Sequence, residues 1–189
     1  MQGRVGLAPI EQALEVGRAI GAPDAMATRN AFRTLCNSPT MAVGVFTHLT
    51  TLLNKNTFST RLRELAIMRI GWSTGSAYEW TQHWRWATNA KIPDADILAV
   101  RDWRNATNLT EADRAILAAT DEMLAGGKIT DATWAECCKH VPTKAEQVEM
   151  VVCIANWIMF SNILRTLEIP VEDGVLVWPP NGEKPANAD

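Results

Sequence analysis

A glutamate and a histidine stand four residues apart in the segment Gly75-Ser-Ala-Tyr-Glu-Trp-Thr-Gln-His83. On a helix, where each residue turns by about 100°, Ser76, Glu79 and His83 share one stripe, and the side chains of Glu79 and His83 can touch. Burial raises the pKa of a carboxyl group, and a nearby carboxylate raises that of an imidazole. A buried pair of this kind would be poised to transfer protons near neutral pH.

The same spacing is also typical of an exposed ion pair, which contributes only about 0.3–0.5 kcal/mol on a helix surface. The surrounding tryptophans favour burial, because Trp72, Trp80, Trp84 and Trp86 cannot all face water cheaply. A glutamate and a histidine held in such surroundings need partners. The local pattern therefore leaves both interpretations open.

Helical periodicity dominates the sequence, and alternating strand patterns are nearly absent. The patterns Thr110 to Asp113 and Thr143 to Glu146 predict capped helix starts. The sequence predicts an all-α fold of seven to nine helices, over 9–20, 24–36, 40–54, 61–72, 76–90, 93 onward, 110–124, 132–140 and 143–167. We expect the helices 61–72 and 76–90 to form a two-helix core that packs against the long helix 143–167.

The composition is that of a globular protein. With 189 residues, 47% of them hydrophobic and 21% charged, the chain is expected to form one domain over 1–172 and an extended C-terminal tail over 173–189. A net charge of −3 with mixed signs disfavours binding to nucleic acid or to a membrane surface.

The first ten residues contain no secretory apolar segment, and the apolar stretch Val151–Phe160 is shorter than the roughly 20 residues of a membrane span. We therefore expect a cytoplasmic protein with four reduced cysteines.

The runs Arg63-Glu-Leu-Ala-Ile-Met-Arg69 and Gly75 to His83 resemble the carboxymuconolactone decarboxylase family, whose relatives include the alkylhydroperoxidase D-like proteins. The resemblance extends over about residues 25–172. The further segments that carry it are Asn30–Leu35 with Ser38-Pro39, Ile129–Trp134 and Asn162–Pro170. The resemblance implies a single-domain helical bundle and a homo-oligomer, commonly a trimer or hexamer, with sites at or near subunit contacts.

The peroxidase branch of this family combines a glutamate, the two cysteines of a CxxC pair and a histidine at fixed spacing. Carried over to this chain, the glutamate falls on Glu64, the histidine on His83, and the two cysteine positions on Ser76 and Glu79. Serine and a carboxylate cannot form a disulfide or supply a thiolate, so this comparison excludes a thiol peroxidase at the site. The acid/base residues Glu64, Glu79 and His83 remain, with the hydroxyl of Ser76.

That set suits proton transfer without a cofactor. We expect a carbon–carbon lyase, resembling a decarboxylase, that acts on a small carboxylated lactone or a related ring-cleavage product of aromatic catabolism. His83 would protonate or stabilise an enolate, Glu79 would orient His83, and Glu64 would be the other end of the relay. The candidates for substrate binding are Arg33, Arg69 and Trp80.

Other functions stay open at this point. The same residues suit isomerisation, dehydration or lactone hydrolysis, and a metal site on Glu64, Glu79 and His83 is a further alternative, although no metal or cofactor is expected. A different class is a non-catalytic oligomeric scaffold that has lost the thiols of its relatives. Convergence of the three side chains on one closed pocket would favour an enzyme, and an exposed, divergent trio would favour a scaffold.

Overall fold

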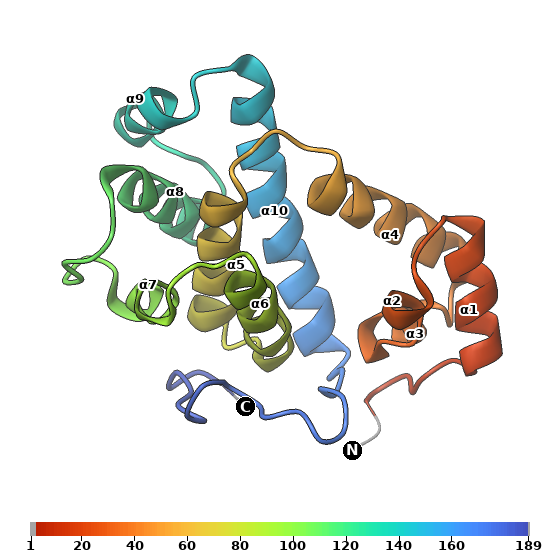
Figure 1. The fold of residues 1–189 in the computed structure, drawn as a ribbon. Coiled ribbons are helices and arrows are strands. Elements are labelled where there is room, and N and C mark those ends of the chain that lie inside the picture. Colours follow the sequence, from red (N-terminus) through yellow and green to blue (C-terminus); the bar gives the residue numbers. More distant parts are fainter. Residues whose placement is uncertain (1–2, 189) are drawn as a thin grey trace. The chain divides into compact units, whose positions relative to one another are not determined.

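The computed structural model describes residues 3–188 and confirms the all-α fold. Within these residues the chain forms ten α-helices and one short 3-10 helix, and no β-strand (Figure 1). In chain order the elements are α1 (Ile10–Ala19), α2 (Asp24–Ala27), α3 (Asn30–Leu35), α4 (Pro39–Asn54), α5 (Thr60–Thr74), α6 (Ala77–Asn89), α7 (Asp94–Ala99), η1 (Val100–Asp102), α8 (Glu111–Gly126), α9 (Asp131–His140) and α10 (Lys144–Thr166).

The helix ends follow the capping signals of the sequence. Thr110 and Asp113 exchange side-chain and backbone hydrogen bonds at the start of α8, and Thr143 exchanges the same bonds with Glu146 at the start of α10. The prediction of one helix over 24–36 is wrong, because Arg29 adopts an extended conformation (φ −67, ψ 145) as the N-cap of α3. The described residues therefore hold ten α-helices rather than seven to nine.

The described residues divide into two compact units. The first contains the described residues up to Asn56 together with Asn162–Val175, and in it α1 packs against α2, α3 and α4. The second contains Thr57–Ser161 and the residues from Leu176 onward. The single domain over 1–172 and the tail over 173–189 stay a prediction.

The two helices that carry the candidate site lie at the centre of the second unit. Helix α5 packs along α6 and α8 and is buried over most of its length (Figure 1). Gly71 allows the close approach of α6, since a Cβ at this position would lie 3.1 Å from the backbone nitrogen of Trp80. Gly75 then ends α5 in the left-handed conformation (φ +72) and Ser76 begins α6 as its N-cap. Glu64 on α5 is thereby brought to the same core as Glu79 and His83 on α6.

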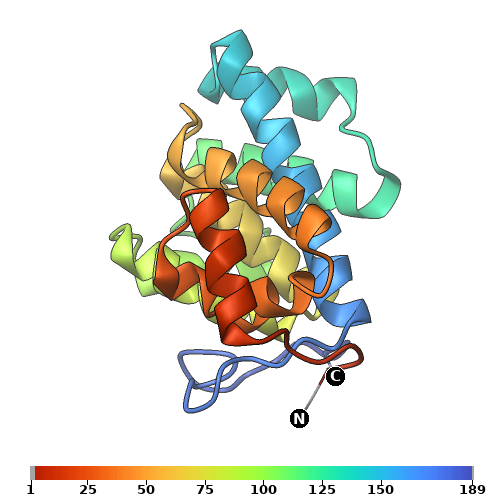
Figure 2. The same cartoon turned by 90° about the vertical axis from the view of Figure 1, so that its right-hand side faces the viewer.

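Residues 176–188, here called the C-terminal arm, contain no helix and belong to the second unit; they form part of the dark-blue coil at the bottom of Figure 2. Trp178 is buried, and its ring lies beside those of Trp72 and Trp80. The indole N–H of Trp80 donates to the backbone of the arm at 2.8 Å. Further along the arm, Asn187 donates from Nδ2 to the carbonyl oxygen of Ser73 at 2.9 Å. The C-terminal arm thus contacts both helices that flank the α5–α6 turn.

Among the described residues, α10 is the one helix long and apolar enough to cross a membrane, by length and composition alone. The expectation from sequence considered only Val151–Phe160, whereas the whole helix has 23 residues. Half of its most apolar window is buried within the protein, and core helices of soluble proteins pass the same test. This helix is therefore weak evidence for a membrane span.

Candidate acid/base site

Three side chains from three helices meet at the imidazole ring of His83. Glu64 on α5 lies at one ring nitrogen, with 2.8 Å between Glu64 Oε2 and His83 Nδ1. Glu79, one turn before His83 on α6, places its Oε2 3.4 Å from Nε2. Trp157 on α10 donates its indole N–H to the same Nε2 at 3.1 Å. Both ring nitrogens of His83 are therefore contacted by groups that exchange or orient protons.

The site is almost closed to solvent. The exposed fraction is 0% for Glu64, 3% for Glu79 and 8% for His83. Arg63, 6% exposed, donates from Nε to Glu64 Oε1 at 3.1 Å. Glu64, Glu79 and His83 thus converge and are buried, which is not the exposed, divergent arrangement expected of a scaffold.

The surroundings of Glu64 keep this carboxyl group ionised. Burial alone would raise the pKa of Glu64, but the charges and hydrogen bonds of His83 and then Arg63 outweigh burial and hold the pKa below its ordinary value. An ionised Glu64 accepts the Nδ1–H of His83 and so fixes the tautomer of the ring. The sequence predicts this orienting contact for Glu79, whereas in the structure Glu64 contacts Nδ1 and Glu79 faces Nε2. The catalytic roles of both glutamates stay a prediction.

Glu79 is the carboxyl group whose protonation changes near neutral pH. Burial raises the pKa of Glu79 to about 7, with the charge of His83 opposing the rise and that of Glu64 adding to it. Both the neutral acid and the carboxylate of Glu79 are therefore populated at pH 7. The two glutamates at this imidazole therefore differ in protonation. Glu64 is a fixed negative charge, and Glu79 is a group that can donate a proton.

His83 has two sets of hydrogen bonds available. An unprotonated Nε2 accepts the indole N–H of Trp157, whereas a protonated Nε2 would direct its own proton toward Glu79. Burial alone would lower the pKa of His83, but Glu64 and then Glu79 raise it above the ordinary value. Glu79 Oε2 and His83 Nε2, 3.4 Å apart, therefore form an ion pair when His83 carries its second proton and Glu79 is ionised.

The donor arrangement at His83 does not favour a metal ion. Among residues 3–188, no group of three or more His, Cys, Asp or Glu side chains is placed to hold one. Glu64 and Glu79 approach different nitrogens of one ring. In this arrangement the two carboxylates and one imidazole nitrogen do not surround a common point, as the ligands of a protein metal site do.

The other predicted site residues have contacts of their own. Ser76 is the buried N-cap of α6, and its hydroxyl has no hydrogen-bond partner among the described residues. Arg69 pairs with Asp121 and donates to two backbone carbonyls, so substrate binding by Arg69 would require this ion pair to open. Trp80 is fully buried in the aromatic core, and Arg33, in the first unit, donates to a backbone carbonyl. Substrate binding by Arg33, Arg69 and Trp80 stays a prediction.

Sequence reasoning missed Arg63 and Trp157. Arg63 stands next to Glu64 within the run that resembles the family, so a cation adjacent in sequence to the matched glutamate was the available signal. Trp157 lies 74 positions from His83, and spacing along the chain cannot reveal such a contact. Its signal was weaker: a tryptophan in the most apolar stretch must find an acceptor for its N–H when buried.

The cysteines do not supply a thiolate to this site. All four are free, and Cys153 on α10 lies near enough to Arg63 and Glu64 to interact with their charges. Burial raises the pKa of Cys153 well above its ordinary value, so the group stays a thiol. The charged groups around His83 are therefore carboxylates and a guanidinium.

Comparison with known proteins gives a match for the part of the chain that holds these helices. Residues 39–122 match the model of the carboxymuconolactone decarboxylase family, and this range includes Glu64, Ser76, Glu79 and His83. The resemblance found in the sequence is thereby confirmed. No curated protein matches the chain.

Solved structures share the fold over most of the chain. A peroxidase-related protein from Ralstonia eutropha JMP134, with an alkylhydroperoxidase AhpD core, has a TM-score of 0.74 and 15% identity and covers 92% of this chain and 94% of its own. A peroxidase-related protein from Silicibacter sp. TM1040 has a TM-score of 0.69 and 13% identity, covering 93% and 95%. The debrominase Bmp8, in a variant bound to 2,3,4-tribromopyrrole, has a TM-score of 0.67 and 16% identity, covering 87% and 84%. At these identities the comparison shows a shared fold.

Proposed function

We propose that this chain, whose residues 39–122 match the model of the carboxymuconolactone decarboxylase family, is a cofactor-independent carbon–carbon lyase. The proposed substrate is a small carboxylated lactone or a related ring-cleavage product of aromatic catabolism. The observation that carries the proposal is the buried imidazole of His83 between the fixed carboxylate of Glu64 and the proton-exchanging carboxyl group of Glu79. The small ring compound bound by the debrominase of similar fold is consistent with a substrate of this size.

The proposed reaction needs one proton and no redox partner. The bond between the ring and the substrate carboxylate breaks, carbon dioxide leaves, and the electron pair of that bond passes into a dienolate. A buried, nearly dry site favours this step, because the carboxylate is poorly solvated there and its negative charge passes into the dienolate as carbon dioxide leaves. Protonated Glu79, or His83 after accepting the proton of Glu79, delivers the proton to carbon, and solvent then reprotonates the relay. Glu64 keeps the imidazole in the tautomer that leaves Nε2 free to take part.

The test is proton NMR in D₂O with 4-carboxymuconolactone and a panel of related lactone acids. The proteins compared are the wild type, Glu79→Gln and His83→Asn, with Glu111→Gln as a control at an exposed glutamate. We expect the wild type and the control to release the carboxylate and place deuterium on carbon. Both site variants should be slower by about 10²–10⁴-fold, the usual contribution of general acid–base catalysis.

The other outcomes distinguish the alternatives. Deuterium exchange or isomerisation without loss of carbon would keep the proton-transfer site and replace the reaction by that of an isomerase, dehydratase or hydrolase. Conversion that is unaffected by Glu79→Gln and His83→Asn would remove these residues from the mechanism. No conversion of any compound in the panel would overturn the lactone substrate and favour the scaffold.

A further inference from the structure

Helix α10 carries a buried amide without a partner. Asn156 is 4% exposed, and neither its Nδ2 nor its Oδ1 has a hydrogen-bond partner among residues 3–188. The other buried amide side chain of this helix behaves differently, since Gln147 donates from Nε2 to the carbonyl oxygen of Val141 at 3.1 Å. Most buried polar groups in folded proteins have a hydrogen-bond partner, so an unpaired carboxamide requires an explanation.

Asn156 lies on α10 between two residues that interact with the acid/base site, Cys153 and Trp157. It directly precedes Trp157, whose indole N–H contacts His83. One turn earlier on the same helix, Cys153 is close enough to Glu64 to interact with its charge. At about 100° per residue, Asn156 lies roughly 100° from Trp157 and 60° from Cys153 around the helix, on the same side of Trp157 as Cys153. The carboxamide is therefore on the edge of the α10 face that contacts the site.

Folding alone does not account for an asparagine at this position. An unpaired buried amide loses its bonds to water without replacing them, and an apolar side chain of similar size would avoid that loss. Asparagine also has a lower helix propensity than leucine. A residue that weakens folding, on a helix that contacts a reactive group, is typical of a functional position, where a ligand supplies the missing bonds.

We propose that Asn156 binds the substrate of the acid/base site. The Nδ2–H groups donate to an oxygen of a carboxylate or lactone carbonyl, and Oδ1 accepts from a hydroxyl group or water of the bound compound. The ligand class is a small organic acid with a carbonyl-type oxygen near the group that exchanges a proton. This inference rests on the proposed function of the site. It places a substrate contact on α10, on the side of Trp157 where Cys153 lies and opposite to the side of Ile154.

The experiment compares Asn156→Leu with Gln147→Leu, a matched change at the paired amide of the same helix. We expect the Tm of the Asn156→Leu variant to equal that of the wild type or to exceed it by up to about 2–4 °C, because the substitution removes an unpaired polar group. Gln147→Leu should lower the Tm, because it leaves the Val141 carbonyl without its donor. A lower Tm for Asn156→Leu would overturn the inference and show a structural role, such as binding an internal water.

Ligand binding supplies the second measurement. Calorimetry with saturated carboxylated butyrolactones, which cannot lose carbon dioxide through a dienolate, should show wild-type binding that weakens about tenfold to hundredfold in Asn156→Leu, the range for a hydrogen bond to a charged group. Steady-state kinetics should show the loss mainly in KM. Equal binding by both proteins, or no binding by the wild type, would overturn the inference. Binding that depends on Asn156 without any turnover would instead refute the proposed reaction and keep the substrate contact.

Discussion

At the scale of single residues, the decisive feature is that two glutamates contact the same imidazole and differ in their own neighbours. Both carboxyl groups are buried, but Glu64 contacts His83 at 2.8 Å and Arg63 at 3.1 Å, whereas Glu79 lies 3.4 Å from His83 and is repelled by Glu64. One carboxyl group therefore stays charged and the other exchanges a proton near pH 7. This difference follows first from the charge and hydrogen bond of His83 on Glu64, and then from those of Arg63.

The protonation of Glu79 makes the free energy of unfolding depend on pH. Its pKa rises from the ordinary 4.5 to about 7 on folding, so the folded chain binds this proton more tightly than the unfolded chain. The stabilisation is complete below pH 4.5 and is lost as pH rises through about 7. The loss amounts to about 3 kcal/mol, since a tenfold change in proton affinity corresponds to about 1.4 kcal/mol.

Glu79→Gln should remove this part of the pH dependence. Urea unfolding between pH 5 and pH 8 is expected to show a flatter stability profile for the variant than for the wild type. Glu111→Gln, at an exposed glutamate, should keep the wild-type profile. Parallel profiles for Glu79→Gln and the wild type would show that Glu79 ionises with an ordinary pKa.

Sequence reasoning reached the members of this site more readily than their roles. The spacing of Glu79 and His83 predicts their contact, and family spacing predicts the participation of Glu64. The assignment of Glu64 and Glu79 to the two ring nitrogens depends on how α5 and α6 are rotated against each other. That rotation is set by packing, including the close approach at Gly71, and has no local signal.

At the scale of elements, the α5–α6 turn packs closely against the C-terminal arm. A Cβ at Gly75 would lie 2.7 Å from the backbone oxygen of Asn187. Gly127, which ends α8, has the same positive φ of +72 and nothing within 4 Å of such an atom. Substitutions at the two glycines therefore distinguish two costs: backbone strain, which both share, and contact with the arm, which only Gly75 has.

Gly75→Ala should destabilise the protein more than Gly127→Ala. Both substitutions place a side chain in the left-handed conformation, at a cost of roughly 1–2 kcal/mol. Gly75→Ala must also displace the backbone of the arm, which adds about 1–3 kcal/mol, as overpacking does in a core. Chemical unfolding of both variants measures the difference. In a chain truncated after Val175 the two substitutions should cost the same, and a difference that persists there would rule out the arm as its source.

The ends of helices could be predicted from the sequence where a side chain caps the helix. The hydroxyls of Thr110 and Thr143 cap α8 and α10 at the expected places. The break between α2 and α3 has neither proline nor glycine at Thr28 and Arg29, so periodicity alone continued the helix. The packing of the C-terminal arm was equally hidden, because a polar, proline-containing segment carries no helical or strand pattern to predict its contacts.

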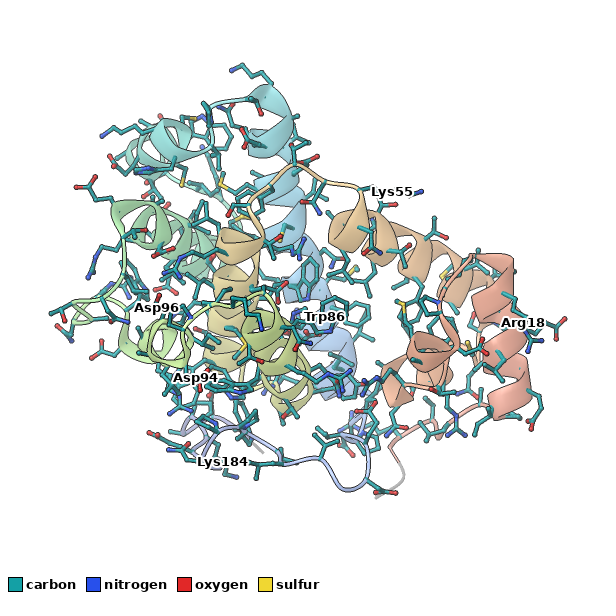
Figure 3. All side chains as sticks on the ribbon, in the orientation of Figure 1. Arg18, Lys55, Trp86, Asp94, Asp96 and Lys184 are labelled. Carbon is teal, nitrogen blue, oxygen red and sulfur yellow. The ribbon has the colours of Figure 1, made fainter. Side chains whose placement is uncertain are left out.

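At the scale of the whole molecule, we propose the trimer or hexamer that the family resemblance implies, acting in the cytoplasm without nucleic acid or membrane. Several large apolar side chains are exposed in the single chain. Trp86 on α6 (labelled in Figure 3) is 47% exposed, and Val148 and Met159 on α10 are 62% and 42% exposed. Exposed tryptophans are typical of contact surfaces between proteins.

Sedimentation velocity tests this proposal. The wild type should sediment as a trimer or hexamer whose Tm rises with protein concentration. Trp86→Glu should shift the distribution toward smaller species, because a charge would be buried in the contact. Lys128→Glu, at an exposed residue after α8, serves as the control and should sediment like the wild type. A wild-type monomer at every concentration would refute the assembly.

The indole cluster also gives this protein an optical signature. The rings of Trp72 and Trp80 are 5.2 Å apart, and that of Trp178, from the C-terminal arm, lies 6.0 and 5.9 Å from them. Aromatic transitions at such separations couple and produce paired bands of opposite sign in circular dichroism. Because one of the three chromophores belongs to the arm, the amplitude of that couplet would register whether the arm is docked, in solution and without any added dye.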